Sequence, residues 1–154
     1  MEKQFELLRI TRNNVLEFAA KFTIEELNTT PTNFNNNIIW NIGHLIATQQ
    51  SLCYKMANLE TIIYGEFIER YKKGSAPDKF VGEEEWKFIK ENLIKTISPS
   101  LEDYNHKKFQ RFNKYETSYG NTLENIDDAI TFNNVHEGMH FGFIKAIGNV
   151  LGKS

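Results

Sequence analysis

Apolar residues recur every three or four positions along most of this chain, and this spacing is typical of amphipathic α-helices. The pattern predicts four main helices, near residues 3–22, 36–59, 83–104 and 122–150. No stretch shows the alternation with β-branched residues that is typical of a sheet. We therefore expect an all-α fold, a four-helix bundle with two long crossover connections. The 154 residues fit a single domain.

Short segments between the main helices carry signals of their own. Thr23 and Glu26 have the spacing of a capping box and predict a helical turn over residues 23–27. Residues 66–71 have the composition of a short helix within a crossing that glycines otherwise interrupt.

The stretch before the last helix is less regular. Residues 107–121 are aromatic and charged without a clear period, so we expect an ordered loop that crosses the bundle. Thr122, followed by Asn125 three residues later, is the predicted start of the last helix.

The predicted helix 36–59 is apolar around most of its circumference, as expected of a buried helix. One narrow strip is mainly polar. When each residue is placed 100° around the helix from the one before it, the strip contains Trp40, Asn41, His44, Thr48, Ser51 and Lys55. Unpaired polar groups in a core cost several kcal/mol. The strip therefore predicts a cavity, with Trp40, Asn41, Thr48 and Ser51 as lining residues. Cys53 lies nine positions from His44, on the opposite side, and is interpreted as a core thiol.

The last predicted helix carries two histidines four residues apart, His136 and His140. On a helix they project toward a common point, which is the geometry that a metal ion requires of two imidazoles. HExxH is also the signature of zinc metalloproteases, in which the glutamate is the general base and a third ligand follows. Here no His, Asp, Glu or Cys follows His140. A third ligand must come from upstream: His44, His106 or a carboxylate.

His44 is the best of these candidates, because it lies on the polar strip of another buried helix. Three imidazoles from two facing helices form an open metal site, although a histidine pair alone is also consistent with hydrogen-bonded core residues. His106 lies in a charged segment and is expected to be exposed. Glu137 lies about 60° from His140 around the helix. It is interpreted as a support for the ligands or an ion-pair partner, with a role as ligand, general base or proton shuttle as the alternative.

Charge and composition narrow the partners. A net charge of −2, from 18 basic and 20 acidic residues, gives no reason to expect nucleic acid or an anionic membrane. One cysteine excludes an intramolecular disulfide, and the first residues lack the apolar run of a signal peptide, so a cytoplasmic location is expected. No apolar stretch approaches the roughly 18 residues of a membrane span.

Two segments resemble motifs of the DinB/YfiT-like superfamily. Trp40-Asn41-Ile42-Gly43-His44-Leu45 resembles W-x-x-x-H-L, and His136-Glu137-Gly138-Met139-His140-Phe141-Gly142 resembles H-E-x-x-H-x-G. The resemblance implies a four-helix bundle with up-down-down-up connections, often a homodimer, and a divalent metal at His44, His136 and His140. One departure concerns the finer subfamily: the family often has Gln after that last glycine, whereas here Phe143 follows.

The resemblance also implies an activity. Relatives include thiol-dependent enzymes such as bacillithiol S-transferases and mycothiol-dependent maleylpyruvate isomerase. An open metal position lowers the pKa of a thiol and presents it to an electrophile. We therefore expect a transferase that uses a low-molecular-weight thiol and a small-molecule substrate; the alternatives are a metal-dependent hydrolase and a metal-binding stress protein without turnover. Three imidazoles suit zinc, nickel, cobalt or iron, and we expect zinc, with the other three as alternatives.

Overall fold

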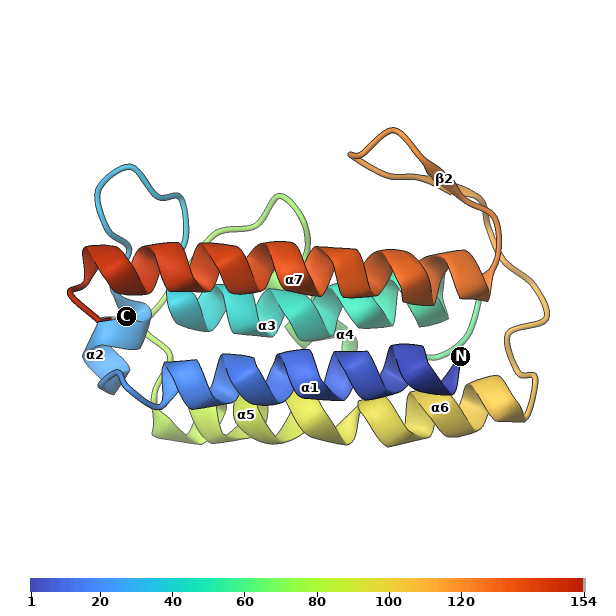
Figure 1. The fold of residues 1–154 in the computed structure, drawn as a ribbon, viewed down its shortest axis with the longest axis horizontal. Coiled ribbons are helices and arrows are strands. Elements are labelled where there is room, and N and C mark those ends of the chain that lie inside the picture. The colour runs from blue at the N-terminus through green and yellow to red at the C-terminus, as the bar shows by residue number, and fades with distance from the viewer. Residues whose placement is uncertain (154) are drawn as a thin grey trace.

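The computed structural model describes residues 1–153 and is mostly helical (Figure 1), which confirms the predicted all-α class. In chain order its elements are α1 (Glu2–Ala19), α2 (Ile24–Asn28), α3 (Ile38–Gln49), the π-helical segment η1 (Gln50–Lys55), α4 (Gly65–Tyr71), α5 (Glu83–Lys95), α6 (Ile97–Asn105), β1 (Tyr115–Glu116), β2 (Thr122–Leu123) and α7 (Ile126–Val150).

Four helical rows, formed by α1, by α3 with η1, by α5 with α6, and by α7, lie side by side. The rows α1 and α7 run in one direction and the other two run in the opposite direction (Figure 1). α1 contacts α7 and α5, and α3 contacts the same two helices. The rows therefore enclose a common apolar core, whose fully buried members include Val15, Ile42, Leu45, Leu93 and Ile144.

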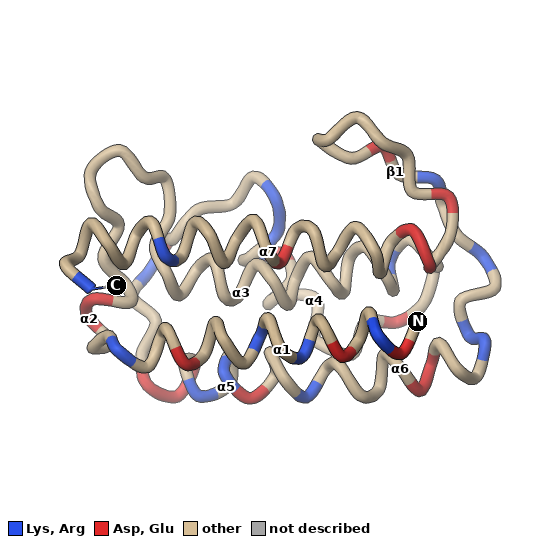
Figure 2. The backbone as a smooth tube through the Cα atoms, viewed as in Figure 1, with Lys and Arg blue, Asp and Glu red and all other residues tan. Residues whose placement is uncertain are grey.

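α3 is the most enclosed of these helices. Every residue in it except Thr48 is buried, and none is charged, so it is uniformly tan in Figure 2. Asn37 caps it by accepting a hydrogen bond of 2.8 Å from the Trp40 backbone N–H. Charged residues of both signs are instead interspersed along α1, α5 and α6 (Figure 2). The polar residues on α3 therefore lie inside the protein.

Three predicted helix boundaries are corrected by the structure. The first helix ends at Ala19 instead of residue 22, and the α-helical part of the second ends at Gln49. Residues 50–55 follow it as a π-helix. The sequence did not predict this change, because the hydrophobic pattern does not distinguish i to i+4 from i to i+5 hydrogen bonding. The predicted helix 83–104 is interrupted at Thr96. Pro99 lies three residues later, where it has no N–H to donate to the preceding turn.

The last helix begins at Ile126, not at Thr122, and the structure contains a short sheet that we did not predict. Thr122 and Leu123 pair with Glu116 and Tyr115 in an antiparallel hairpin. The helix is capped by Asn125, whose side chain accepts a 3.0 Å hydrogen bond from a backbone N–H in the first turn. The loop predicted for residues 107–121 therefore contains one strand of this hairpin.

Other local predictions are confirmed. The capping box is present, with Thr23 and Glu26 each accepting a hydrogen bond from the other's backbone N–H. The short helix predicted for residues 66–71 is α4, which packs against α3.

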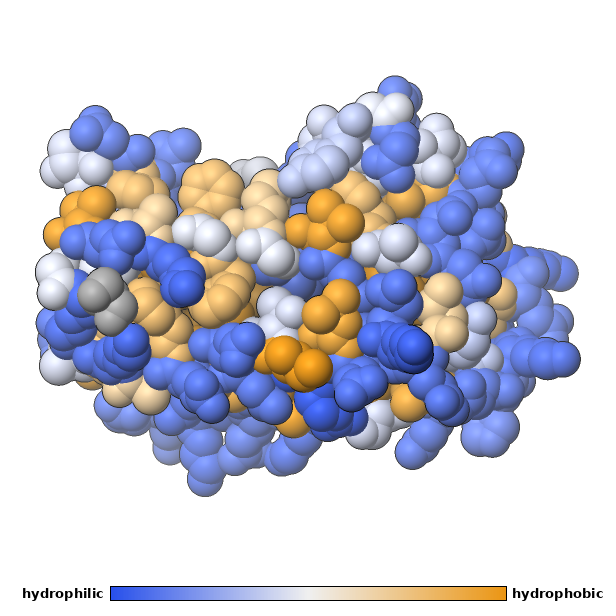
Figure 3. Space-filling model, viewed as in Figure 1, coloured by the Kyte–Doolittle hydropathy of each residue, from blue (hydrophilic) through white to orange (hydrophobic). Residues whose placement is uncertain are grey.

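Apolar side chains also reach the surface. On the face seen in Figure 3 they gather over α7 and its junction with α1, whereas the edge formed by α5 and α6 is mainly hydrophilic. Exposed apolar side chains of these two helices are Leu7, Ile10, Val135, Phe143 and Val150. None of the helices within residues 1–153 has the length and apolar character needed to cross a bilayer.

Candidate metal centre

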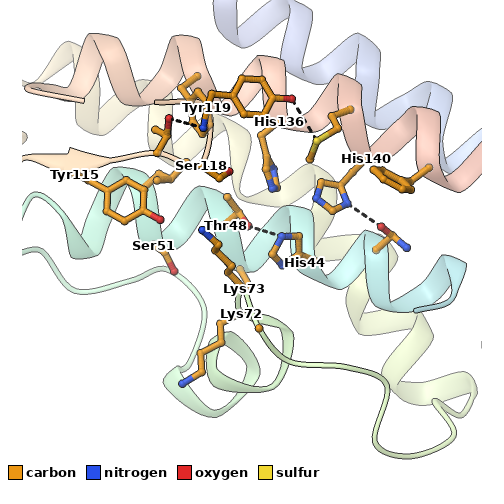
Figure 4. Close-up of a pocket in the computed structure, with 18 of the residues that line it drawn as sticks. His44, Thr48, Ser51, Lys72, Lys73, Tyr115, Ser118, Tyr119, His136 and His140 are labelled. Carbon is orange, nitrogen blue, oxygen red and sulfur yellow. Dashed lines mark hydrogen bonds between the residues drawn. The ribbon is translucent and has the colours of Figure 1, made fainter. Parts of the chain in front are cut away.

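His44 on α3 and His136 and His140 on α7 come together beside a cavity (Figure 4). Their ring centroids are 5.1 Å apart for His44 and His136, 4.7 Å for His44 and His140, and 4.4 Å for His136 and His140. One nitrogen from each ring lies within 4.8 Å of the other two. The structure thus brings together the three histidines that the sequence singled out as ligands.

The ring of His44 is held by the chain on both sides. Its Nδ1 lies 2.6 Å from the Tyr71 carbonyl oxygen, and because a carbonyl only accepts, Nδ1–H is the donor. The lone pair is then on Nε2, which lies 3.3 Å from Thr48 Oγ1. Trp40 stacks on the ring with an interplanar angle of 11° and a centroid distance of 4.8 Å. These contacts orient His44 before any ligand arrives.

Asn41 orients His140 in the same way. The Asn41 amide nitrogen donates to the Asn37 carbonyl and to Asn36 Oδ1, at 2.7 and 2.8 Å. Its Oδ1 therefore faces His140, whose Nδ1–H donates to it over 2.7 Å. The Nε2 lone pair of His140 is left available. Asn41 was expected only to line the pocket, and it also fixes the tautomer of a candidate ligand.

His136 provides a test of whether the residues fit a metal. Its Nδ1 is buried and has no hydrogen-bond partner within the described residues. Buried polar atoms are rarely left unpaired unless water, an ion or a ligand completes them. An imidazole with an unpaired nitrogen, beside two others whose Nε2 atoms carry the lone pair, fits a divalent ion that prefers nitrogen donors.

The electrostatics of the site favour neutral imidazoles. Burial lowers the pKa of His44. Burial, followed by repulsion from His140 and His44, lowers the pKa of His136 to about 2. Burial, followed by repulsion from His44, lowers the pKa of His140 to about 3. At neutral pH the rings are therefore uncharged, which is the state that binds metal.

The histidines open into a cavity of about 490 Å³, within the range of small-molecule sites. All four predicted lining residues are present: Trp40, Asn41, Thr48 and Ser51. Sequence reasoning missed the lining residues from the loop after α4, from the hairpin and from α7: Lys72, Lys73, Gly74, Tyr115, Thr117, Ser118, Tyr119, Phe132, Met139 and Phe143. Asn36, Ala47, Leu52 and Met56 complete the wall. The aromatic residues before α7 were the only signal that could have pointed to the hairpin.

The polar strip on the second helix is corrected at its far end. Lys55, predicted to lie on the strip, does not line the cavity and pairs with Glu69 at the surface. Met56 lines the cavity instead. The reason is the π-helical turn: the Met56 N–H donates to the Ser51 carbonyl, so positions five apart share this face.

Glu137 lies next to the ligands in sequence but does not line the cavity. Its carboxylate and the Arg12 guanidinium form an ion pair of 2.6 Å, and both side chains are fully buried. Arg12 also donates to the Leu93 carbonyl at 2.7 Å and to Thr96 Oγ1 at 3.0 Å. The geometry matches the ion-pair interpretation of Glu137, and its carboxylate makes no contact with the histidine rings among the hydrogen bonds of residues 1–153.

The cysteine and the fourth histidine of the chain lie away from the site. Cys53 is buried in an apolar cluster with Phe5 and Leu8, as the helical wheel predicted. His106 is exposed at the end of α6.

The chain was compared with curated proteins and with protein-family models. The search of curated proteins found no match to the chain. A protein-family model, that of the DinB superfamily, matches residues 7–144 and so spans both histidine motifs. The mostly helical fold, the three clustered histidines and this match together show that the chain belongs to the DinB superfamily.

Proposed function

We propose that the chain is a metal-dependent enzyme that holds a divalent ion, zinc in the first place, with His44, His136 and His140. The observation that carries the proposal is the cluster of three neutral imidazoles at the wall of a cavity of about 490 Å³. Catalytic zinc sites keep a position open beside three protein ligands, whereas structural sites are usually closed by four. The only group of three or more candidate ligand residues found within residues 1–153 is this trio. This argues against a purely structural metal.

We propose further that the reaction is transfer involving a low-molecular-weight thiol. A bound divalent ion supplies Lewis acidity, which lowers the pKa of a thiol at neutral pH. The chain supplies the remaining elements: His44 and His140 are oriented by Tyr71 and Asn41, and apolar side chains line the cavity where a small electrophile would bind. Trp40, Thr48 and Ser51 would contact the thiol or its acceptor.

Metal-dependent hydrolysis is the weaker alternative. Hydrolases of this kind generally use a carboxylate near the ion as general base, as the zinc metalloproteases do. Within the described residues no Asp or Glu lines the cavity, and Glu137 is engaged by Arg12. Because the cavity lacks a carboxylate that could act as general base, thiol transfer is better supported than attack by water.

Single substitutions of the three histidines test the metal site. We expect His44→Ala, His136→Ala and His140→Ala each to lower zinc affinity by more than tenfold, because two imidazoles hold the ion far less well than three. Circular dichroism should show an unchanged helical fold. His106→Ala, which removes an exposed imidazole, is the matched control and should bind zinc as the unaltered chain does. Full zinc occupancy in His44→Ala, measured by elemental analysis, would overturn the proposed site.

The reaction class needs a separate assay. We expect the zinc-loaded protein to accelerate loss of a generic electrophile only when a thiol is added, and the acceleration to vanish in His44→Ala. Turnover of an ester without thiol would favour the hydrolase.

The four-helix-bundle class and the homodimer implied by the family resemblance also stay proposals. The closed ring of four helical rows supports the bundle, and light scattering measures the oligomeric state.

A further inference from the structure

The cavity wall carries positive charge without any negative charge. Among its lining residues are two lysines, Lys72 and Lys73, and, within residues 1–153, no aspartate or glutamate. The chain as a whole has 20 acidic and 18 basic residues, so a wall of a single sign is not a consequence of composition. Cavities lined by one sign of charge concentrate ligands of the opposite sign.

The two lysines differ in what they do. Lys72 Nζ lies 2.6 Å from Glu69 Oε2, and its side chain points out of the cavity (Figure 4). Lys73 makes no hydrogen bond or ion pair with any other described residue, and Figure 4 shows its side chain rising into the cavity. Of the two cations, only Lys73 is therefore left to be neutralised by a ligand.

Hydroxyl groups surround the same part of the cavity. Ser51 on η1, Tyr115 on β1 and Ser118 in the hairpin turn line it (Figure 4). In the part of the chain that the structure describes, none of these three hydroxyls has a hydrogen-bond partner, although each is an O–H donor. A cation with nearby unengaged O–H donors is suited to the oxygens of an anion.

The number and type of cationic side chains in the cavity favour a carboxylate over a phosphate. A phosphate group carries close to two charges and is commonly met by the bidentate fork of arginine. No arginine lines the cavity among residues 1–153, and one unpaired lysine matches a single negative charge. Phe132, Met139 and Phe143 line the cavity from α7 and offer an apolar wall for a carbon chain.

We propose that the cavity binds a small carboxylate whose anionic end is held by Lys73 and the hydroxyls of Ser51, Tyr115 and Ser118. The opposite end of the ligand lies at the three histidines. This inference rests on the proposed function for that second end, and it specifies the thiol of the proposed transfer as a mercaptocarboxylate. Lys73 is then the residue that selects acidic thiols over neutral ones.

The anionic end is tested in metal-free protein, so that the result does not depend on the metal. The probes are phenylbutyrate and its neutral counterpart phenylbutyramide, titrated into isotope-labelled protein and followed by the Trp40 indole N–H signal in NMR spectra. Trp86 does not line the cavity and provides the internal reference. Partly exposed ion pairs contribute little, so we expect the carboxylate to bind roughly two- to fivefold more tightly.

Two lysine variants serve as the matched pair. Lys73→Met should abolish the preference for the carboxylate, because it removes the unpaired cation while keeping a long side chain. Lys72→Met removes the same charge one residue away and should keep the preference. Equal affinity for the two probes in the unaltered protein, or equal loss in both variants, would overturn the inference.

The complete ligand is tested in cobalt-loaded protein with mercaptohexanoate and mercaptohexanol, followed by visible absorption. We expect the carboxylate form to bind more tightly and Lys73→Met to remove that advantage. Failure of cobalt or of either thiol to bind would contradict the proposed metal-dependent function, and the metal-free titration would then decide the carboxylate site alone. Binding of both thiols with equal affinity would contradict the carboxylate site and leave the metal centre intact.

Discussion

Among single residues, Arg12 and Glu137 form a fully buried ion pair one position away from a candidate ligand. Arg12 comes from α1, and its further hydrogen bonds to Leu93 and Thr96 reach α5 and the residue after it. The pair therefore ties α7 to α1 and, through the further hydrogen bonds of Arg12, to the row of α5 and α6. Since His136 and His140 project from α7, the rotation of this helix decides whether they face α3. Glu137 takes part in this anchorage, and it does not line the cavity.

Glu137→Gln should destabilise the fold by about 3 to 5 kcal/mol, because removing one partner of a buried pair leaves the other charge uncompensated. Chemical denaturation of the metal-free protein measures this loss. The double variant Arg12→Met with Glu137→Leu should recover most of it, since no unpaired charge then remains. Zinc affinity should change less than in His136→Ala. A Glu137→Gln variant with unchanged stability and lost turnover would favour the proton-shuttle role.

The Cys53 thiol should stay protonated and unreactive in the folded protein at neutral pH. Burial raises the pKa of its thiol to about 12, whereas in the unfolded chain it ionises near its ordinary value of about 8.5. Because the folded state holds its proton to higher pH, the stabilisation linked to Cys53 is fully present below about pH 8.5 and is lost progressively toward pH 12. The difference in unfolding free energy between the unaltered chain and Cys53→Ala should thus narrow between pH 7.5 and 10.

Labelling of the Cys53 thiol tests its burial independently of the stability measurement. A disulfide reagent at pH 8 should label Cys53 only after denaturant is added, and Cys53→Ala should retain full zinc content. Loss of zinc in a folded Cys53→Ala protein would show that the helical-wheel argument is wrong.

Between elements, the closest approach that bears on the site is that of α3 to the end of α4. A Cβ built on Gly43 would lie 2.6 Å from the Tyr71 ring, so no larger residue fits without moving Tyr71. The Tyr71 carbonyl is the acceptor that fixes His44. The glycine before His44 thus lets α4 lie close enough to orient a candidate ligand.

Gly43→Ala should therefore lower both the unfolding free energy and the zinc affinity, because the displaced Tyr71 no longer holds the His44 tautomer. Gly138→Ala is the control: it lies between His136 and His140 on α7, and a Cβ there meets nothing within 4 Å. In that open helical position alanine should stabilise the fold by roughly 0.5 to 1 kcal/mol. Equal zinc affinity in the two variants would contradict the role given to Gly43.

How much the sequence could predict depends on the range of the interaction. The helices and the His136 and His140 pair follow from local periodicity, and the polar strip on α3 indicated His44. The hairpin that roofs the cavity could not be predicted, because its strands have two residues each and show no period. Lys73 was missed for a related reason: it follows α4 in an aperiodic loop, whose path is set by packing against α3.

For the fold as a whole, the apolar core extends far beyond the metal centre. Its largest cluster joins side chains from α1, α3, α5 and α7, and a second cluster gathers around Phe5, Cys53 and Ile130. Fully burying one leucine, isoleucine or phenylalanine side chain is worth about 1.5 to 3 kcal/mol. The fold thus has a source of stability that does not involve His44, His136 or His140, in contrast to zinc fingers, which are unfolded without metal.

Removing metal with a chelator should therefore leave the helical circular dichroism signal unchanged and lower only the melting temperature. A ligand that binds the folded state alone stabilises it by about 2.7 kcal/mol when its free concentration is one hundred times the dissociation constant. For a chain of this size that corresponds to roughly 5 to 10 °C. His44→Ala should melt at the same temperature with and without zinc, because its site no longer distinguishes folded from unfolded protein, while His106→Ala should keep the full zinc-dependent rise. Loss of the helical signal in chelator alone would mean that the metal is part of the core, and the apolar clusters could not then be the main source of stability.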